Sequence, residues 1–423
     1  MRAAIWNQSD DSLCIVIPAL NEEESIVSTA ERCKRFRELA VRTRLLSHVD
    51  IVVVSDGSTD RTLELARSVD GIRTIEFVQN RGYGAAIQEG WQTSDCNLLA
   101  FLDADGTCDP DVFEDLCLNI IRRNADLALG TRMGPDSQMP RIRRLGNRVY
   151  AMMLGVLCGR SVTDTASGMR VLRRSALERL GELPTGLNFT PAMSARALLG
   201  GLQVVEVPMS YAERVGESKL RIFSDGIRFF CSIIDAAFCF RPDRPFTLAF
   251  LATFMFASML AMYPTEFYLQ NGRVEEWMIY RFVCACLFGG LSLLSLSAVA
   301  VCHQLTRLGP RAEATDSYWA YAVSRLFRGR VAMSLVMLGL GASVAVLWPG
   351  IVEFLTTRTC TLHWTRLIFG ASLILMSGIV GGTSAVLRVI SLLARESATS
   401  VAAKTPLVRL AMEPDDLMAA RSA

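Results

Sequence analysis

The stretch that decides the fold is Leu98-Leu99-Ala100-Phe101-Leu102-Asp103-Ala104-Asp105-Gly106, an apolar run that ends in two carboxylates one residue apart. Such a run before a glycine turn is typical of a central parallel strand that is covered on both faces. Residues i and i+2 at a strand end point the same way, so Asp103 and Asp105 can bind one hard cation. Ligands of open α/β sheets bind at this end of the strands. A bare Asp-x-Asp pattern is more often a turn or a helix cap, so the flanking sequence decides its meaning.

Further short strand-like segments occupy residues 14–18, 51–54, 75–78 and 127–131. Their alternation with helical segments, one of which is expected to begin with an acidic first turn at residues 21–24, predicts a parallel sheet with right-handed crossovers. Asp56, the Gly82/Gly84 loop and Arg132 follow these strands and should meet at one edge of the sheet. There Asp56 could bind a base or ribose, the glycine backbone could approach a ligand, and Arg132 could neutralise a phosphate. Helix capping and turn formation are the alternative interpretation of each of these residues.

Apolar residues are concentrated after residue 245. The chain of 423 residues is 51% hydrophobic and has a net charge of only +2, so no nucleic-acid partner is expected. Four runs contain no charged side chain, namely residues 246–263, 282–302, 331–347 and 367–387. Each run approaches the roughly 20 residues that cross a bilayer, which predicts a membrane protein. Buried helices of a soluble protein are the alternative interpretation.

The distribution of arginine and lysine predicts the orientation in the membrane. Residues 1–11 are polar and lack an apolar secretory segment, so the first domain is expected to be cytoplasmic. Basic residues before the first apolar run, between the second and third, and after the last run also indicate the cytoplasmic side. Arg358 and Arg366, in the short loop after the third run, are a mild exception.

A series of motifs lies in a fixed order along residues 12–240. The motifs are IVIPALNE (15–22), VSDGS (54–58), the glycine loop, DADGT (103–107), GTR (130–132), DTASGMR (164–170) and RVGESK (214–219). This series resembles the family 2, GT-A-fold glycosyltransferases, and especially the polyprenol-phosphate sugar synthases of the dolichol-phosphate mannose synthase type.

The resemblance implies a set of site residues. Nucleotide-sugar binding would fall to Pro18, Leu20, Glu22, Val54, Asp56, Asp103, Ala104, Thr107, Arg214, Ser218 and Lys219. Asp103 and Asp105 would bind Mg²⁺ or Mn²⁺ on the diphosphate of the donor. Thr107 and Tyr83 stand where many relatives carry Gln and Lys, so the identity of the sugar stays open.

Two amphipathic segments are expected near the acceptor. Residues 141–153 combine dense arginine with apolar residues at helical spacing, which is typical of a helix on a membrane surface, or alternatively of a solvated basic face. Residues 222–240 carry an apolar stripe that Arg221, Asp225, Arg228 and Asp235 interrupt. We expect an interface helix there, separated from the first span by Pro242 and Pro245, and an ordinary packing helix is the alternative. By resemblance, Arg143, Asn147 and Arg170 would contact the acceptor phosphate.

The predicted reaction is inverting transfer of one sugar from a nucleotide-diphosphate sugar, of the GDP-mannose or UDP-glucose type, to a polyprenyl phosphate. Asp105, Arg132 and Asp164 are the candidate catalytic residues, with Asp164 as a base or an organiser of the acceptor, or alternatively a simple turn residue. A phosphate monoester is already largely dianionic at neutral pH, so it needs little activation. The alternatives are a glycosyltransferase with another lipid or glycan acceptor and a non-catalytic membrane assembly protein.

The predicted fold class is α/β, a GT-A nucleotide-sugar-binding, Rossmann-like domain with interface helices, followed by an all-α transmembrane domain of four helices. The expected divisions are a cytoplasmic catalytic domain (1–220), an interface helix (221–245), a transmembrane domain (246–390) and a cytoplasmic tail (391–423). The four helices of the transmembrane domain are expected at about 246–265, 280–302, 331–352 and 367–388. The Gly378-x-x-x-Gly382 pattern favours close helix packing and is compatible with a homo-oligomer.

Overall fold

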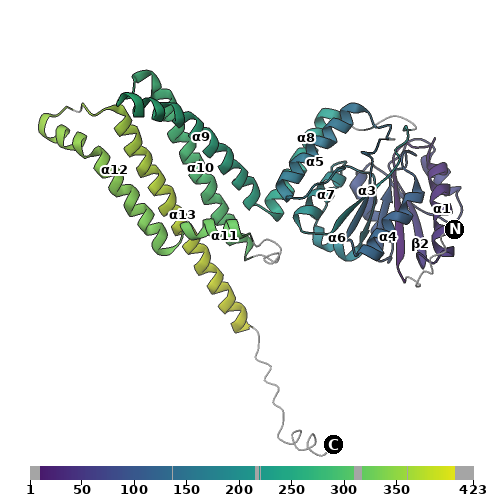
Figure 1. The fold of residues 1–423 in the computed structure, drawn as a ribbon. Coiled ribbons are helices and arrows are strands. Elements are labelled where there is room, and N and C mark those ends of the chain that lie inside the picture. Colours follow the sequence, from purple (N-terminus) through teal and green to yellow (C-terminus); the bar gives the residue numbers. More distant parts are fainter. Residues whose placement is uncertain are drawn as a thin grey trace, which may run out of the picture. The chain divides into compact units, whose positions relative to one another are not determined.

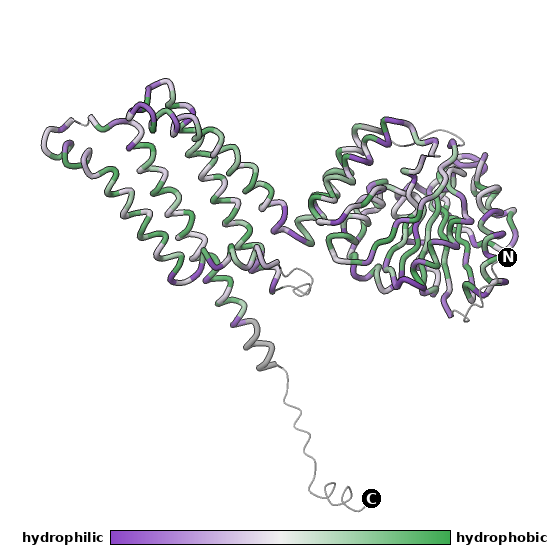
Figure 2. The backbone as a smooth tube through the Cα atoms, viewed as in Figure 1, coloured by the Kyte–Doolittle hydropathy of each residue, from purple (hydrophilic) through white to green (hydrophobic). Residues whose placement is uncertain are grey.

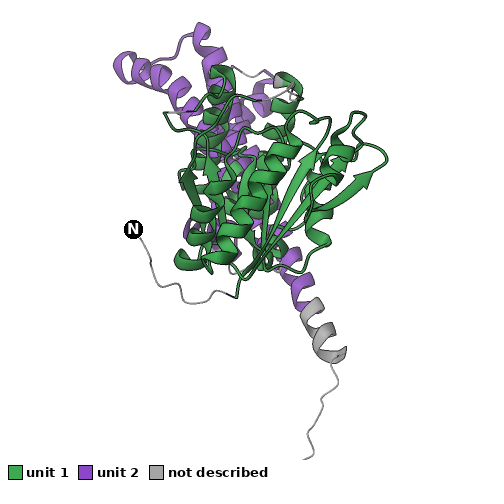
Figure 3. Ribbon diagram, turned by 90° about the vertical axis from the view of Figure 1, so that its right-hand side faces the viewer, with its two compact units in different colours: residues 1–245 green, residues 246–423 purple. Residues whose placement is uncertain are grey.

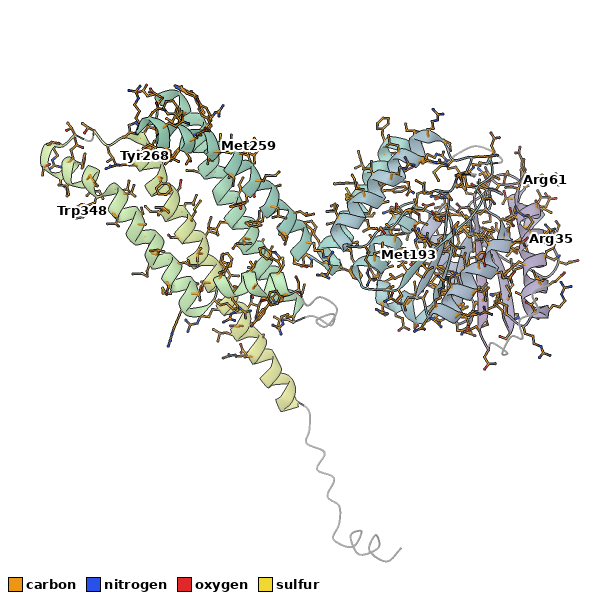
Figure 4. All side chains as sticks on the ribbon, viewed as in Figure 1. Arg35, Arg61, Met193, Met259, Tyr268 and Trp348 are labelled. Atoms are coloured by element: carbon orange, nitrogen blue, oxygen red, sulfur yellow. The ribbon has the colours of Figure 1, made fainter. Side chains whose placement is uncertain are left out.

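The computed structural model describes residues 10–135, 137–214, 219, 221–308, 317–359 and 361–404. The chain forms two compact units, residues 1–245 and 246–423, which Figure 3 colours separately. Large side chains differ in their placement between the two units. Met193 lies inside the first unit, from which Arg35 and Arg61 project, whereas Met259, Tyr268 and Trp348 project from the helices of the second (Figure 4).

One seven-stranded sheet forms the centre of the first unit, in the order β3-β2-β1-β4-β6-β5-β7. Its strands are β1 (Ser12–Ala19), β2 (His48–Asp56), β3 (Arg73–Phe77), β4 (Leu98–Leu102), β5 (Leu127–Thr131), β6 (Met169–Arg173) and β7 (Val204–Pro208). All neighbours pair in parallel except β6, which runs antiparallel to both β4 and β5. The prediction of a parallel sheet is therefore wrong at β6, a five-residue strand whose two arginines conceal its apolar pattern.

Helices cover both faces of this sheet (Figure 1). They are α1 (Ile26–Arg42), α2 (Thr62–Arg67), α3 (Tyr83–Gln92), α4 (Phe113–Arg123), α6 (Arg174–Leu180) and α7 (Phe189–Leu199), with a 3₁₀ turn at Pro110–Val112. Side chains of α1 and α4 form one core, and those of α3, α6 and α7 form the other. Strand residues alternate between the two cores, as Ile15 and Val16 do in β1. All five residues of β4 are buried, as expected for a central strand.

The acidic segment before α1 is a turn and not the first turn of a helix, so that prediction is wrong. The helix begins at Ile26, because Asn21 adopts a left-handed conformation with φ 50° and its side chain accepts a hydrogen bond from the Thr59 N–H at 2.8 Å. The Glu22 N–H donates to Thr62 Oγ1 at 2.8 Å. These bonds fix the turn against the segment that follows β2 and leave Glu22 at the edge of the sheet.

Two amphipathic helices, α5 (Arg141–Cys158) and α8 (Ile222–Phe240), pack with α7 in a third apolar cluster. Their other faces carry exposed apolar side chains at helical spacing, namely Ile142, Leu145, Val149, Met152 and Val156 on α5 and Phe223, Ile227, Phe230 and Phe238 on α8. We call these residues the apolar stripes. Each helix is therefore apolar on two sides, one of which packs inside the unit.

The described residues from Asp243 onward are mainly helical. The helices are α9 (Asp243–Asn271), α10 (Ile279–Thr306), α11 (Tyr318–Leu326), α12 (Gly329–Thr357) and α13 (Trp364–Lys404), with a 3₁₀ turn at Glu276–Met278. Among the described residues, four helices are long and apolar enough to cross a membrane: α9, α10 with its preceding turn, α12, and α13 as far as Glu396. Figure 2 shows the apolar residues that run along them.

The predicted α/β fold class is confirmed, with a mixed α/β unit followed by four long apolar helices. The observed helices extend beyond the predicted ones, and α13 continues to Lys404. Pro242 separates α8 from α9, but Pro245 lies in the first turn of α9, where proline is compatible with a helix.

The contact between α3 and the sheet predicts an effect of substituting Gly90. A Cβ atom there would lie 2.6 Å from both methyl groups of Val16, so Gly90→Ala should push α3 away from β1. We expect a loss of about 1–3 kcal/mol in stability, measured as a lower Tm of the purified protein in detergent. Gly155→Ala on α5 is the matched control, because its nearest neighbour, the Arg160 carbonyl oxygen, would lie at an ordinary 3.5 Å. Equal Tm values for the two variants would contradict the prediction.

Candidate functional site

A cavity of about 570 Å³ lies where β1, β2, β4 and β5 end, and α5 and α8 form part of its wall. It brings together many predicted site residues, namely Pro18, Leu20, Glu22, Asp56, Asp103, Ala104, Asp105, Arg132, Arg143, Asn147, Arg214 and Lys219. Among the other predicted residues, Val54, Thr107, Asp164 and Arg170 do not line it, and Ser218 lies outside the described residues.

The two carboxylates after β4 are held by different partners. Asp103 Oδ1 accepts a hydrogen bond from the Tyr83 hydroxyl at 2.6 Å. Asp105 Oδ1 accepts bonds from the Thr107 hydroxyl at 2.6 Å and from the Thr107 N–H at 3.1 Å. Burial, and then the neighbouring charge of Asp105, raises the pKa of Asp103 to about 7. Thr107 is itself buried and orients Asp105, and its contact with the nucleotide stays a prediction.

Gly168 gives the Asp103 carboxylate its space. The Asp103 N–H donates to the Gly168 carbonyl at 3.1 Å, just beyond the antiparallel pair of Leu102 and Met169. A Cβ atom on Gly168 would overlap the Asp103 carboxylate. A glycine is therefore required where the segment before β6 passes the end of β4.

Two cationic side chains are bound to the acidic residues of the cavity. Arg214 reaches Glu22 Oε1 with Nη2 at 2.6 Å and Asp105 Oδ2 with Nη1 at 3.3 Å. Lys219 Nζ lies 2.7 Å from the same Glu22 oxygen and donates to the carbonyls of Leu20 and Asn21. Glu22 thus holds both cations beside Asp105.

Asp56 shapes the glycine loop. Its carboxylate accepts hydrogen bonds from the Arg81 N–H at 2.6 Å and from the Gly82 N–H at 2.9 Å. Gly82 has a φ of 106°, and a Cβ there would lie 2.5 Å from the Thr185 carbonyl oxygen. Val54 is completely buried in the sheet, in register with Pro18, so its side chain supports the cavity wall without reaching the cavity.

Asp164 forms a buried ion pair with Arg132. Its two oxygens accept bonds from Arg132 Nε and Nη2, both at 2.8 Å, and Oδ2 also accepts one from the Arg132 N–H at 3.0 Å. Burial alone would raise the pKa of Asp164, but the Arg132 guanidinium outweighs it and holds that pKa below the ordinary 3.8. Asp164 is completely buried and positions Arg132, which lines the cavity, so the prediction of Asp164 as a base or an organiser of the acceptor stays a prediction.

The segment of residues 163–168 is braced from three elements. From β7, Glu206 accepts hydrogen bonds from the N–H groups of residues 163 and 164, both at 2.9 Å. From α5, Asn147 donates to the Thr163 carbonyl at 3.1 Å and accepts from the Thr165 hydroxyl at 2.9 Å. From β6, Arg170 donates to the carbonyls of residues 165 and 167. Arg170 is completely buried and braces this segment, and its contact with the acceptor phosphate stays a prediction.

Several cavity residues were not assigned a contact from the sequence, namely Asn80, Met139, Ile142, Tyr150, Leu187, Thr190, Tyr211, Arg228 and Phe229. In the sequence, Tyr83 stands out only as a departure from the family pattern, and Arg228 only as an interruption of an apolar stripe. Glu206 was also missed, although it is a single acidic residue within the apolar run of β7. A charged residue inside an apolar pattern is the signal that marks both Arg228 and Glu206.

The cavity contains oxygen ligands suited to a divalent cation. Among the described residues, no group of three or more His, Cys, Asp and Glu side chains could hold a metal. Asp103 and Asp105 supply two carboxylates, and Mg²⁺ is commonly bound by one or two carboxylates together with substrate phosphates and water. The Arg214 guanidinium already lies beside Asp105, so a positive charge is accommodated there. The two carboxylates, Asp103 and Asp105, therefore fit a cation that a phosphate ligand would help to coordinate.

The chain is similar in sequence to known glycosyltransferases. Residues 14–181 match the sequence profile of "Glycosyl transferase family 2". The low-salt glycan biosynthesis hexosyltransferase Agl6 of Haloferax volcanii is 36% identical over 224 residues, which are 51% of this chain and 52% of that protein, so the chain spans about half the length of this relative. A dolichyl-phosphate hexose transferase of the same organism is 33% identical over 225 residues, 53% of this chain and 93% of that protein.

A relative with lower sequence identity is also named as a dolichyl-phosphate sugar transferase. The dolichyl-phosphate beta-glucosyltransferase ALG5C of Trichomonas vaginalis is 26% identical over 252 residues, 56% of this chain and 74% of that protein. Among solved structures, glucosyl-3-phosphoglycerate synthase of Mycobacterium tuberculosis, in complex with Mn²⁺, uridine diphosphate and phosphoglyceric acid, has a TM-score of 0.44. It is 18% identical, with 53% of this chain and 78% of that chain covered.

The buried pair predicts a pH-dependent effect of Asp164→Asn. At neutral pH the variant should lose about 3 kcal/mol of stability, because it leaves the buried Arg132 charge without its counter-ion. Since the pKa of Asp164 is lower in the folded than in the unfolded chain, the pair stabilises fully above pH 3.8 and its contribution falls in stronger acid. Unfolding in detergent, followed by circular dichroism at neutral pH and well below pH 3.8, should therefore show a gap from wild type that narrows in acid.

Glu64→Gln is the control for this prediction, because it removes the exposed pair with Arg61 and should change stability little. A gap between wild type and Asp164→Asn that widens in acid would exclude the proposed direction of the Asp164 shift.

Proposed function

The chain belongs to glycosyl transferase family 2, and from this premise we propose that it transfers one hexose from a nucleoside-diphosphate sugar to a polyprenyl phosphate, with inversion at the anomeric carbon. The observation that carries the proposal is the composition of a single cavity. The carboxylates and cations that suit a nucleoside diphosphate lie in the same cavity as residues of α5 and α8, whose other faces are apolar.

The donor would bind beside the ends of β1, β2 and β4. Pro18, Leu20 and Asp56 would contact the nucleoside, because they lie where the first two strands end. Arg214 and Lys219, now held by Glu22, would turn to the diphosphate, which offers them more negative charge than one carboxylate does. Ser218 remains a proposed phosphate contact by resemblance.

Asp103 and Asp105 would hold Mg²⁺ or Mn²⁺. A bound divalent cation neutralises charge on a diphosphate leaving group. The residues of this chain supply the rest: Thr107 orients Asp105, Tyr83 orients Asp103, and Gly168 leaves room for the Asp103 carboxylate. Ala104 lies between the two ligands and lines the cavity.

The acceptor would enter on the side of α5. Arg143 and Asn147 line the cavity from this helix, and Arg132 lines it from the end of β5. We assign the acceptor phosphate to this part of the cavity. A neutral hydroxyl acceptor would need a base, and Asp164 is fully engaged by Arg132, which supports an acceptor that is already anionic.

The membrane arrangement follows from the same proposal. Four helices of suitable length would anchor a multi-pass protein, and the apolar stripes of α5 and α8 would lie at the interface. The arginines that flank the spans favour a cytoplasmic catalytic unit. The proposed divisions therefore remain a catalytic domain to residue 220, an interface helix to 245, a transmembrane domain to 390 and a cytoplasmic tail.

The test is transfer by the purified full-length protein. Labelled UDP- and GDP-hexoses are incubated with undecaprenyl phosphate or with neutral undecaprenol, in the presence of Mg²⁺ or Mn²⁺. We expect a labelled lipid from the phosphate alone. Asp105→Asn should reduce the rate at least ~100-fold, because one of the two carboxylate ligands is lost.

Asp109→Asn is the matched control, since Asp109 lies four residues further along and pairs with Arg32 outside the cavity. Full activity of Asp105→Asn would exclude the metal assignment. Transfer of the labelled sugar to undecaprenol but not to undecaprenyl phosphate would favour the neutral-acceptor alternative. No transfer from any donor would contradict the enzymatic proposal.

A further inference from the structure

Arg228 is a cationic residue of the cavity to which neither the sequence motifs nor the comparisons give a role. It lies on α8 and interrupts the apolar stripe of that helix, between Ile227 and Phe230. Its side chain is 70% exposed and also contributes to the cavity lining. A long cationic side chain at such a position can contact a charged group within the cavity while its helix faces an apolar phase.

A direct contact between α5 and α8 fixes the position of this part of α8. The Tyr150 hydroxyl donates to the Gly226 carbonyl at 2.9 Å, and the Tyr150 ring packs edge-on against Phe229 with centroids 6.2 Å apart. Arg228 lies between these two contact residues. Arg143 and Asn147 lie within two turns before Tyr150 on α5 and line the same cavity. The cavity therefore has basic residues on both helices that bound it.

The ion pair of Arg228 leaves its guanidinium able to bind a second anion. Asp225 Oδ1 lies 3.3 Å from Arg228 Nη1, and the buried Asp225 also accepts a hydrogen bond from the Arg221 N–H at 2.8 Å. Asp225 is thus fixed at the start of α8, where it can orient the Arg228 side chain. A guanidinium has five N–H donors in a planar fork, so one ion pair leaves donors for a phosphate.

We propose that Arg228 is a ligand of the acceptor phosphate, which it binds from α8 while Arg143 binds from α5. The proposal rests on the proposed function and adds to it a residue that selects for a phosphorylated lipid. A phosphate monoester offers three acceptor oxygens that share up to two negative charges, enough for arginines from two sides. Its isoprenoid chain would extend from the cavity toward the two apolar stripes. If Arg228 only stabilised α8 through Asp225, its loss would not distinguish a charged lipid from a neutral one.

The experiment measures equilibrium binding of farnesyl phosphate and of neutral farnesol to the full-length protein in detergent, without a sugar donor. Arg228→Gln should weaken farnesyl phosphate binding by roughly 10-fold, as expected for one charge-assisted hydrogen-bonded contact. Its binding of farnesol and of UDP or GDP should be unchanged. Arg228→Lys, which retains the charge, should recover part of the affinity.

Arg221→Gln is the matched control, because Arg221 is an exposed arginine at the start of α8 that does not line the cavity. The proposal is overturned if Arg228→Gln and Arg221→Gln bind farnesyl phosphate equally well, or if Arg228→Gln loses farnesol and farnesyl phosphate to the same extent. A wild-type protein that binds UDP or GDP but not farnesyl phosphate would instead reject the acceptor of the proposed function. Binding without donor therefore separates the two failures.

Discussion

The antiparallel contact of Gly168 with Asp103 is the constraint on which the site depends. Because β6 runs against β4, the segment before β6 passes directly over the end of the Asp-x-Asp strand. A side chain at position 168 would displace the Asp103 carboxylate, so the backbone there has to be glycine and has to stay in place. The same short segment carries Asp164, which holds Arg132. One backbone path thus fixes an anionic and a cationic member of the cavity together.

This path is stabilised by buried polar contacts and not by an apolar core. Arg170, Glu206 and Asn147 come from three different elements, and each bonds to backbone groups of residues 163–168. Buried backbone groups need such partners, because burying an N–H or C=O group without a hydrogen bond costs free energy. Burial lowers the pKa of Arg170 to about 10, still far above neutrality, so this residue remains charged where it holds the segment.

The sequence predicts those parts of the site that depend on strand ends. Asp56, Asp103 and Arg132 each follow an apolar run, and the rule that parallel strands end at one edge is sufficient to place them together. It does not predict β6, because a five-residue strand with two arginines has no clear period-two pattern. Without β6, neither the burial of Arg170 nor the approach of residue 168 to Asp103 can be anticipated. The pairing of Asp164 with Arg132 cannot be predicted either, because the two residues are 32 positions apart and only the fold brings them together.

Under the proposed function, the two amphipathic helices would let one cavity bind a polar and an apolar group. On α5, Asn147 bonds to the segment that holds Arg132, whereas Leu145 and Val149 on the same helix are exposed. Consecutive residues of a helix point about 100° apart, so a single helix can present polar groups inward and apolar groups outward over the same two turns. A lipid with a charged head and an apolar tail has the same division along its length. In the proposed function, α5 and α8 would therefore bind the phosphate among arginines while the hydrocarbon chain stays on an apolar surface. A cavity enclosed by the sheet alone would not offer that surface.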